Sequence, residues 1–194
     1  LIVLKKAYQS LYPFNKETNA YVIEVSLDDY SELFNGWDAS PLRRKDLEPE
    51  LLDYLEQAGN EIPLKEKIEI CFFVPESKAD SDKEDRSQIG VMNNFRVALF
   101  FINKTLKKHY RHIVTYIVLS MIFLVCAYSL RGITEALLIS LLIEGLFIGG
   151  WFLLWEAFST FFFSTHEARY RRKVFKRFLE SKVTFKSTKT LIHR

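Results

Sequence analysis

Two long stretches of the chain are almost free of charged residues. The first, from Ile113 to Leu130, has 18 residues without a charge, and the second, 136–163, has only Glu144 and Glu156 among its 28 residues. As a helix, the first stretch would be roughly 27 Å long, close to the ~30 Å hydrocarbon core of a bilayer. The sequence therefore predicts a membrane protein with an α-helical transmembrane hairpin of two spans over residues 113–163.

Basic residues flank this hairpin on both sides. Residues 104–112 hold four basic and no acidic residues, and residues 164–194 hold ten basic and two acidic ones. Cytoplasmic flanks of spans accumulate Lys and Arg, so both termini are expected in the cytoplasm and the connector 131–135 outside. The basic clusters are interpreted as topology signals that attract anionic lipid, so the lipid bilayer is an expected partner and nucleic acid is not. The predicted interfacial anchors are Trp151, Trp155, Lys107, Lys108, Arg111, Arg171 and Arg172.

The residues before the hairpin differ from it in charge and in pattern. Residues 1–103 contain 12 basic and 19 acidic residues, and residues 1–88 predict a small cytoplasmic α+β domain. Alternating apolar side chains predict strands at 21–27 and 67–74. Between them we expect a short helix capped by Asp28 and a longer helix that begins at Glu48-Pro49 and ends at Gly59. A connection of this kind favours parallel neighbouring strands, and residues 183–185 are a candidate third strand.

Three further segments complete the predicted organisation. Residues 76–88 contain eight charged residues and no large apolar one, which predicts a mobile loop. Apolar residues recur at intervals of three and four from Met92 to Leu106, so residues 89–112 predict an amphipathic stalk helix that runs into the first span. Residues 164–194 predict a basic cytoplasmic helix followed by the candidate strand.

Two carboxylates lie within the second apolar stretch. Glu144 should lie roughly 12 Å into its helix, where a charge costs a few kcal/mol unless it is protonated, paired or facing water. We therefore expect that it does not face lipid. Either it is a hydrogen-bonded or neutral structural residue, with the hydroxyls of Ser120, Tyr116 or Tyr128 as partners, or it lines an ion or proton path. Glu156 is expected near the inner interface, where its carboxylate costs less.

Glycines follow Glu144 at the spacing of a helix-packing motif. Gly145 and Gly149 are four residues apart, and Gly150 lies beside them. Small residues at this spacing let two helix backbones approach closely within lipid. The partner helix is either the first span of the same chain or a span of another subunit.

The chain carries none of the common catalytic or cofactor motifs. It has no Gly-rich phosphate loop, GxSxG, HExxH or CxxC. His109, His112 and His166 could approach one another, but the surrounding basic residues would oppose a metal ion. Cys71 and Cys126 are the only cysteines, and a disulfide scaffold is not expected. The sequence thus predicts a non-enzymatic protein without catalytic residues, metal or cofactor.

One polar turn could nevertheless bind a partner. The sequence from Trp37 to Pro41 is followed by Arg43-Arg44-Lys45. These residues could bind acidic groups or a phosphate, whereas a solvated loop before a helix is the simpler interpretation.

The segments FNGWDASPLRRKDL at 34–47 and IEGLFIGGWFLLWEAF at 143–158, within this order of parts, carry a resemblance. The pattern resembles small bacterial two-span inner-membrane proteins that combine a cytoplasmic strand-helix-strand module with a helical hairpin. The resemblance implies an inner-membrane location and no catalytic residue.

These observations favour a membrane-anchored interaction or assembly subunit that presents a cytoplasmic domain. It would act as a homo-oligomer or with a partner membrane protein. Two alternatives remain open. One is an oligomeric pore, lined by Glu144 and gated by the cytoplasmic domain, and the other is a membrane-coupled ligand sensor.

Overall fold

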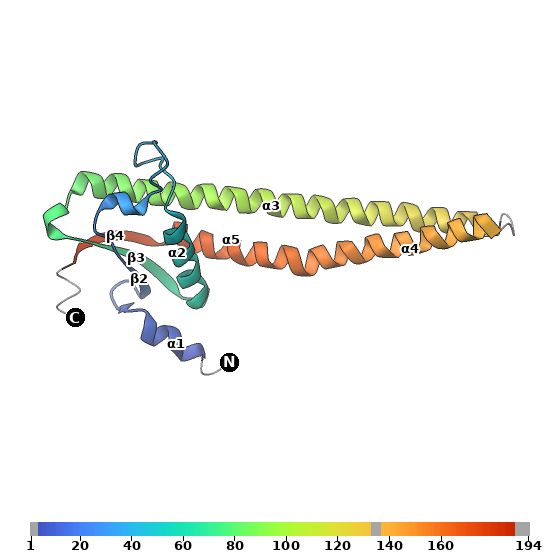
Figure 1. The fold of residues 1–194 in the computed structure, drawn as a ribbon. Helices are drawn as coiled ribbons and strands as arrows, with labels where there is room; N and C mark the ends of the chain where they lie inside the picture. Colours follow the sequence, from blue (N-terminus) through green and yellow to red (C-terminus); the bar gives the residue numbers. More distant parts are fainter. Residues whose placement is uncertain (1–3, 133–136, 189–194) are drawn as a thin grey trace. The chain divides into compact units, whose positions relative to one another are not determined.

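The structure, a computed structural model, describes residues 4–132 and 137–188 (Figure 1). The chain divides into two compact units, one made of residues 1–100 and 172–194 and the other of residues 101–171. The helices are α1 (Leu4–Leu11), η1 (Tyr30–Leu33), α2 (Pro49–Glu61), η2 (Glu76–Lys78), α3 (Ser81–Leu130), α4 (Leu137–Ser159) and α5 (Thr165–Glu180), with a π-helical turn at Thr160–Ser164. The strands are β1 (Phe14–Asn15), β2 (Ala20–Ser26), β3 (Lys67–Val74) and β4 (Lys182–Ser187).

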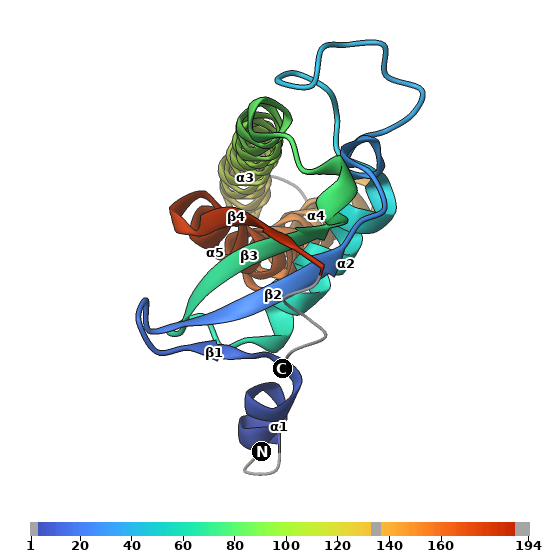
Figure 2. The same ribbon diagram turned by 90° about the vertical axis from the view of Figure 1, so that its left-hand side faces the viewer.

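The first unit is built on a four-stranded mixed sheet in the order β1-β2-β3-β4 (Figure 2). Strands β2 and β3 are parallel, with Ile23 opposite Ile70, and β3 is also parallel to β4, with Phe72 opposite Phe185. The predicted parallel pairing and the candidate third strand are therefore confirmed. The sequence analysis did not predict α1 or the two-residue strand β1, which pairs antiparallel with β2.

The central strand β3 supplies side chains to both faces of the sheet. Ile70 and Phe72 on one face are fully buried, and the Phe72 ring stacks on that of Phe185 with 5.3 Å between centroids. On the opposite face, Cys71 and Phe73 are buried. Burial on both faces explains why the end of this strand reads as a continuous apolar run rather than as an alternation.

The sequence predicted that helix α2 ends at Gly59, but the helix continues to Glu61. A β-carbon at Gly59 would lie 2.7 Å from the Phe178 ring and 3.0 Å from Val174. The glycine therefore permits close contact between α2 and α5 within a helix rather than terminating the helix. The cost of glycine in a helix, about 1 kcal/mol, is offset by this packing.

The prediction of a mobile loop at 76–88 is wrong for most of its length, because η2 occupies 76–78 and α3 begins at Ser81. The Asp80 carboxylate accepts the backbone N–H groups of Asp82 (3.0 Å) and Lys83 (3.2 Å) and so caps α3. The Glu84 carboxylate accepts a hydrogen bond from the Tyr30 hydroxyl at 3.0 Å. Capping and docking thus stabilise a helix here despite the lack of large apolar side chains.

The short helix predicted after β2 is the 3-10 helix η1, and its cap is Asp29 rather than Asp28. The Asp29 carboxylate accepts the N–H and the hydroxyl of Ser31, each at 3.0 Å, and Lys78 lies 3.1 Å away. The backbone hydrogen bond from Ser31, together with Lys78, lowers the pKa of Asp29 to about 2 from 3.8.

This cap predicts a loss of stability in acid. Because the folded pKa of Asp29 lies below the unfolded value, its contribution is present above about pH 4 and is lost as the pH falls towards 2. The thermal midpoint of Asp29→Ala should therefore lie below that of the unmodified chain at pH 6, with a smaller gap at pH 2.5. Asp28→Ala, at the neighbouring exposed residue, is the control. An equal gap at both pH values would contradict the assignment.

Candidate functional site

Among residues 4–132 and 137–188, two helices are long and apolar enough to cross a membrane. They are Ser81–Leu130 and the continuous helical segment Leu137–Glu180, and most of the side chains in their apolar parts are exposed. The second unit contains these apolar parts, namely α3 from residue 101 onward, α4 and the start of α5. Exposed apolar surface of this extent is typical of a surface that meets lipid or another protein.

Within the second unit, α3 and α4 pack through residues spaced by seven. The buried positions are Ile113, Ser120 and Ala127 on α3 and Ile143, Gly150 and Ala157 on α4. The hydroxyl of Ser120 donates to the Gly150 carbonyl oxygen at 2.7 Å. Four of these six side chains are Ala, Ser or Gly, which suits close packing of helices in lipid.

The three glycines of α4 differ in their surroundings. A β-carbon at Gly150 would lie 2.8 Å from the Leu124 side chain, and one at Gly149 would lie 3.1 Å from the Phe123 ring. Both glycines therefore pack against α3 of the same chain. A β-carbon at Gly145 would have no described atom within 4 Å, apart from its chain neighbours and the nearby backbone of its own helix. The same-chain alternative thus applies to Gly149 and Gly150, and Gly145 lies on an open part of α4.

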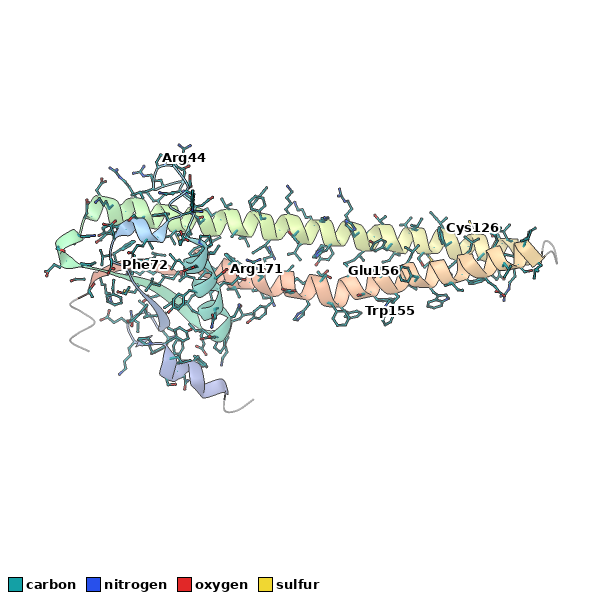
Figure 3. All side chains as sticks on the ribbon, viewed as in Figure 1. Arg44, Phe72, Cys126, Trp155, Glu156 and Arg171 are labelled. Atoms are coloured by element: carbon teal, nitrogen blue, oxygen red, sulfur yellow. The ribbon has the colours of Figure 1, made fainter. Side chains whose placement is uncertain are left out.

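Glu144 lies beside Gly145 on this open part. Its side chain is exposed, and it makes no hydrogen bond or ion pair with any residue that the structure describes. Ser120, one of the three partners predicted for Glu144, donates instead to the Gly150 carbonyl oxygen. Glu156 is half-buried, and Figure 3 shows it on the side of α4 that faces α3.

The predicted interfacial anchors lie on the surface of their helices. Trp151 and Trp155 are exposed, and Figure 3 shows Trp155 pointing away from α3. Arg171 and Arg172 are also exposed on α5. The other predicted anchors, on α3, are Lys107, Lys108 and Arg111. They line a shallow groove of about 540 Å³ together with Phe101, Lys104 and Thr105. Aromatic and basic side chains of this kind suit the headgroup region of a bilayer.

One polar contact of the second unit was not predicted from the sequence. The Arg169 guanidinium donates to the Tyr110 hydroxyl from Nε at 2.8 Å and from Nη2 at 2.6 Å. Its Cζ also lies 5.2 Å from the centre of the Phe161 ring. Arg169 therefore joins α3 to α5 beside the π-helical turn, where sequence spacing gives no signal because the two residues are 59 positions apart.

The histidines and cysteines of residues 4–132 and 137–188 lie apart from one another as ligand groups. No group of three His, Cys, Asp or Glu side chains there could hold a metal ion, and His109, His112 and His166 are not brought together as ligands. Neither cysteine forms a disulfide within the part of the chain that the structure describes; Cys71 is buried in the sheet and Cys126 is exposed on α3.

The features that distinguish this molecule are thus the exposed carboxylate of Glu144, which has no partner among the described residues, the open glycine beside it, and a basic flank on the same helices. Comparison with known proteins finds no matching family model, curated protein or solved structure. The resemblance carried by residues 34–47 and 143–158 therefore stays a prediction.

Proposed function

We propose that the chain is a membrane-anchored assembly subunit, in which α3 and α4 cross the bilayer and the α+β unit lies in the cytoplasm. The open face of α4 binds a transmembrane helix of a second subunit. The inner membrane is the proposed location, with residues 131–135 outside. This proposal assigns no reaction to the chain.

The observation that carries the proposal is the surroundings of Glu144. The residue lies seven positions after the start of α4, or about 10 Å along the helix. An unpaired charge near the bilayer centre costs about 2.5–3.5 kcal/mol on insertion scales. A neighbouring helix with a hydrogen-bond donor would remove part of this cost, and Gly145 gives its backbone room to approach.

The assembly surface is tested by substitutions at Glu144. Glu144→Gln keeps the shape and the hydrogen-bonding capacity, so the mass of the nanodisc-embedded particle should stay that of an oligomer. Glu144→Leu removes the hydrogen bond and should weaken association about fivefold, the equivalent of about 1 kcal/mol. Glu156→Leu, on the side that faces α3, is the matched control. A monomeric unmodified chain would refute the proposal.

The alternative of a pore is separated by the same variants. If Glu144 lines a conducting path, Glu144→Gln alters the field on a permeating cation, so the current in a reconstituted bilayer changes while the oligomer persists. Under the assembly proposal, neither the unmodified chain nor this variant carries current. A cation current that Glu144→Gln alters would replace assembly by conduction as the function.

The orientation is tested by labelling cysteines from outside intact cells. With Cys126 replaced by serine and Cys71 left buried in the sheet, an impermeant thiol reagent should label Thr134→Cys and should not label Ser187→Cys. The reason is the basic flanks at 104–112 and 164–194, which keep the termini in the cytoplasm. Labelling of Ser187→Cys but not of Thr134→Cys would show the opposite topology.

A further inference from the structure

Residues 35–47 of the first unit form a loop whose two ends are joined. Phe34 and Leu47 pair as an antiparallel bridge, and the Asn35 N–H donates to the Asp46 carbonyl oxygen at 2.8 Å. Inside the loop, the Asp38 carboxylate accepts the N–H groups of Ser40 at 2.9 Å and Asp46 at 2.8 Å. The hydrogen bond from Asp46 is the main cause that lowers the pKa of Asp38. The loop is therefore ordered by its own polar groups.

Side chains of helix α3 also form hydrogen bonds with this loop. The Asn94 amide donates to the Lys45 carbonyl oxygen at 2.8 Å and its oxygen accepts the Leu47 N–H at 3.0 Å. Asn93 donates to the Arg43 carbonyl oxygen at 2.8 Å. Any β-carbon at Gly90 would collide with the backbone of the loop. A loop fixed in this way has already lost the conformational entropy that binding would otherwise cost.

The fixed loop presents one large aromatic side chain and two exposed arginines. Trp37 is 98% exposed, and Arg43 and Arg44 are exposed near it in sequence. Figure 3 shows Arg44 pointing away from the ribbon. Trp and Arg are among the residues enriched at the energetic centres of protein interfaces. A Trp side chain that stays in water lacks the favourable free energy that burial of its ring would supply. We name Trp37, Arg43 and Arg44 the loop patch.

A surface of opposite charge lies on α2 of the same unit. Its outer face lines a shallow groove of about 460 Å³, formed by Asp53, Glu56, Gln57, Asn60 and Glu61. The Tyr12 hydroxyl donates to Glu61 at 2.6 Å, and this hydrogen bond is the main cause that lowers the pKa of Glu61. The ring of Tyr54, which is about half exposed, belongs to the same helix. We name this surface the α2 groove.

We propose that the loop patch of one copy docks on the α2 groove of a second copy, with Arg43 and Arg44 against Asp53 and Glu56 and with Trp37 against Tyr54. The two surfaces complement each other in charge, and both belong to this chain. Because they are different surfaces, the contact is head-to-tail, and each copy uses its patch on one neighbour and its groove on another. The inference rests on the proposed function, because assembly in one membrane holds the copies close together.

The contact is tested by cross-linking full-length chains in nanodiscs. Two copies with different tags, one with Ala39→Cys in the loop and one with Asn60→Cys in the groove, are co-expressed in a Cys126→Ser background. A short bis-maleimide should join the two tags. Arg44→Glu in the first copy should lower the yield about fivefold, and Asp53→Lys in the second should restore it. Lys16→Glu changes the charge equally away from the loop patch and should leave the yield unchanged.

Three outcomes would overturn the inference. Cross-linking of Ala39→Cys chains with one another would show a loop-to-loop contact instead. Quenching of Trp37 by brominated lipid, in a chain with Trp151→Phe and Trp155→Phe, would place the loop patch in the bilayer. If the particle keeps an oligomeric mass but the two tags are never joined, the docking fails while the proposed function stands. A monomeric particle would instead refute the proposed function itself.

Discussion

Replacing Arg177 by methionine should destabilise the α+β unit by about 3 kcal/mol or more. Only 8% of Arg177 is exposed, and its guanidinium donates to four backbone carbonyl groups at and after the end of α2. Nη1 reaches the oxygens of Ile62 at 3.1 Å, Pro63 at 2.8 Å and Glu66 at 3.5 Å, and Nη2 reaches that of Gly59. The Pro63 carbonyl oxygen also accepts the Glu66 N–H at 2.9 Å, but methionine would take the guanidinium donor away from the buried carbonyl oxygens of Gly59 and Ile62 near the end of the helix.

Two further variants make this test specific. Lys176→Met changes the exposed neighbour, whose ammonium lies 3.7 Å from Glu180, and should cost less than about 1 kcal/mol. Arg177→Lys keeps the charge but lacks the planar fork, so its stability should lie between those of the other two. Thermal unfolding in detergent, followed by circular dichroism, gives the order of the three midpoints. Equal midpoints for Arg177→Met and Lys176→Met would show that the hydrogen bonds from Arg177 to the end of α2 contribute nothing to stability.

Replacing Gly150 by leucine should separate α3 from α4. The new side chain would overlap Leu124, whose atoms lie 2.8 Å from the position of a β-carbon, and would displace Ser120 from the Gly150 carbonyl oxygen. Overpacking and the lost hydrogen bond together cost about 3 kcal/mol. The same substitution at Gly145 has open space around it, so it should leave the hairpin intact and act only on a second subunit.

Spin labels distinguish these two effects. With nitroxides at Val118 and Phe152, both exposed in the hairpin, the distance distribution should stay narrow for Gly145→Leu and broaden for Gly150→Leu. The particle mass should fall for Gly145→Leu, because its bulk blocks the proposed partner helix. A hairpin that tolerates leucine at Gly150 would contradict the close packing of α3 on α4, and an unchanged oligomer with Gly145→Leu would remove that face from the assembly surface.

Strong periodicity made the sheet and the long helices predictable. The alternation at 67–74 predicted β3, and the stripe from Met92 to Leu106 predicted a helix that runs without a break into the apolar stretch. Ile102 and Leu106 of this stripe are buried in the structure. Such patterns repeat over many residues, so one exceptional side chain does not hide them.

The errors came from residues whose role depends on distant partners. Glycine is a residue type that often ends a helix. At Gly59, however, the missing side chain makes room for Phe178, which lies 119 positions later in the chain. Residues 81–88 lack apolar side chains, yet Asp80 caps them and Tyr30 binds Glu84. Local composition contains no information about such contacts, and tertiary packing overrides it.

The candidate site was predictable in part. Glu144 and its neighbouring glycines stand out in an apolar segment because charge and small size are rare there. Their division into inward and outward positions was not predictable, since the heptad phase of α4 is visible only once α3 lies against it. The sequence drew attention to the turn that contains Trp37, Arg43 and Arg44, but the contacts that order it could not be predicted. Arg177 was missed because the basic residues of 164–194 were attributed to topology alone.

The π-helical turn at Thr160–Ser164 changes the register of one long helix. Buried residues on α4 recur every seven positions at Ile143, Gly150 and Ala157, but the next buried residue is Thr165, eight positions on. The turn therefore contains one residue more than the heptad count requires. A deletion within it would restore the count and keep the inward face, whereas a deletion elsewhere in α4 would rotate all later side chains by about 100°. A one-residue deletion is therefore expected to be tolerated within Thr160–Ser164, between the apolar and the basic helix, and not within α4.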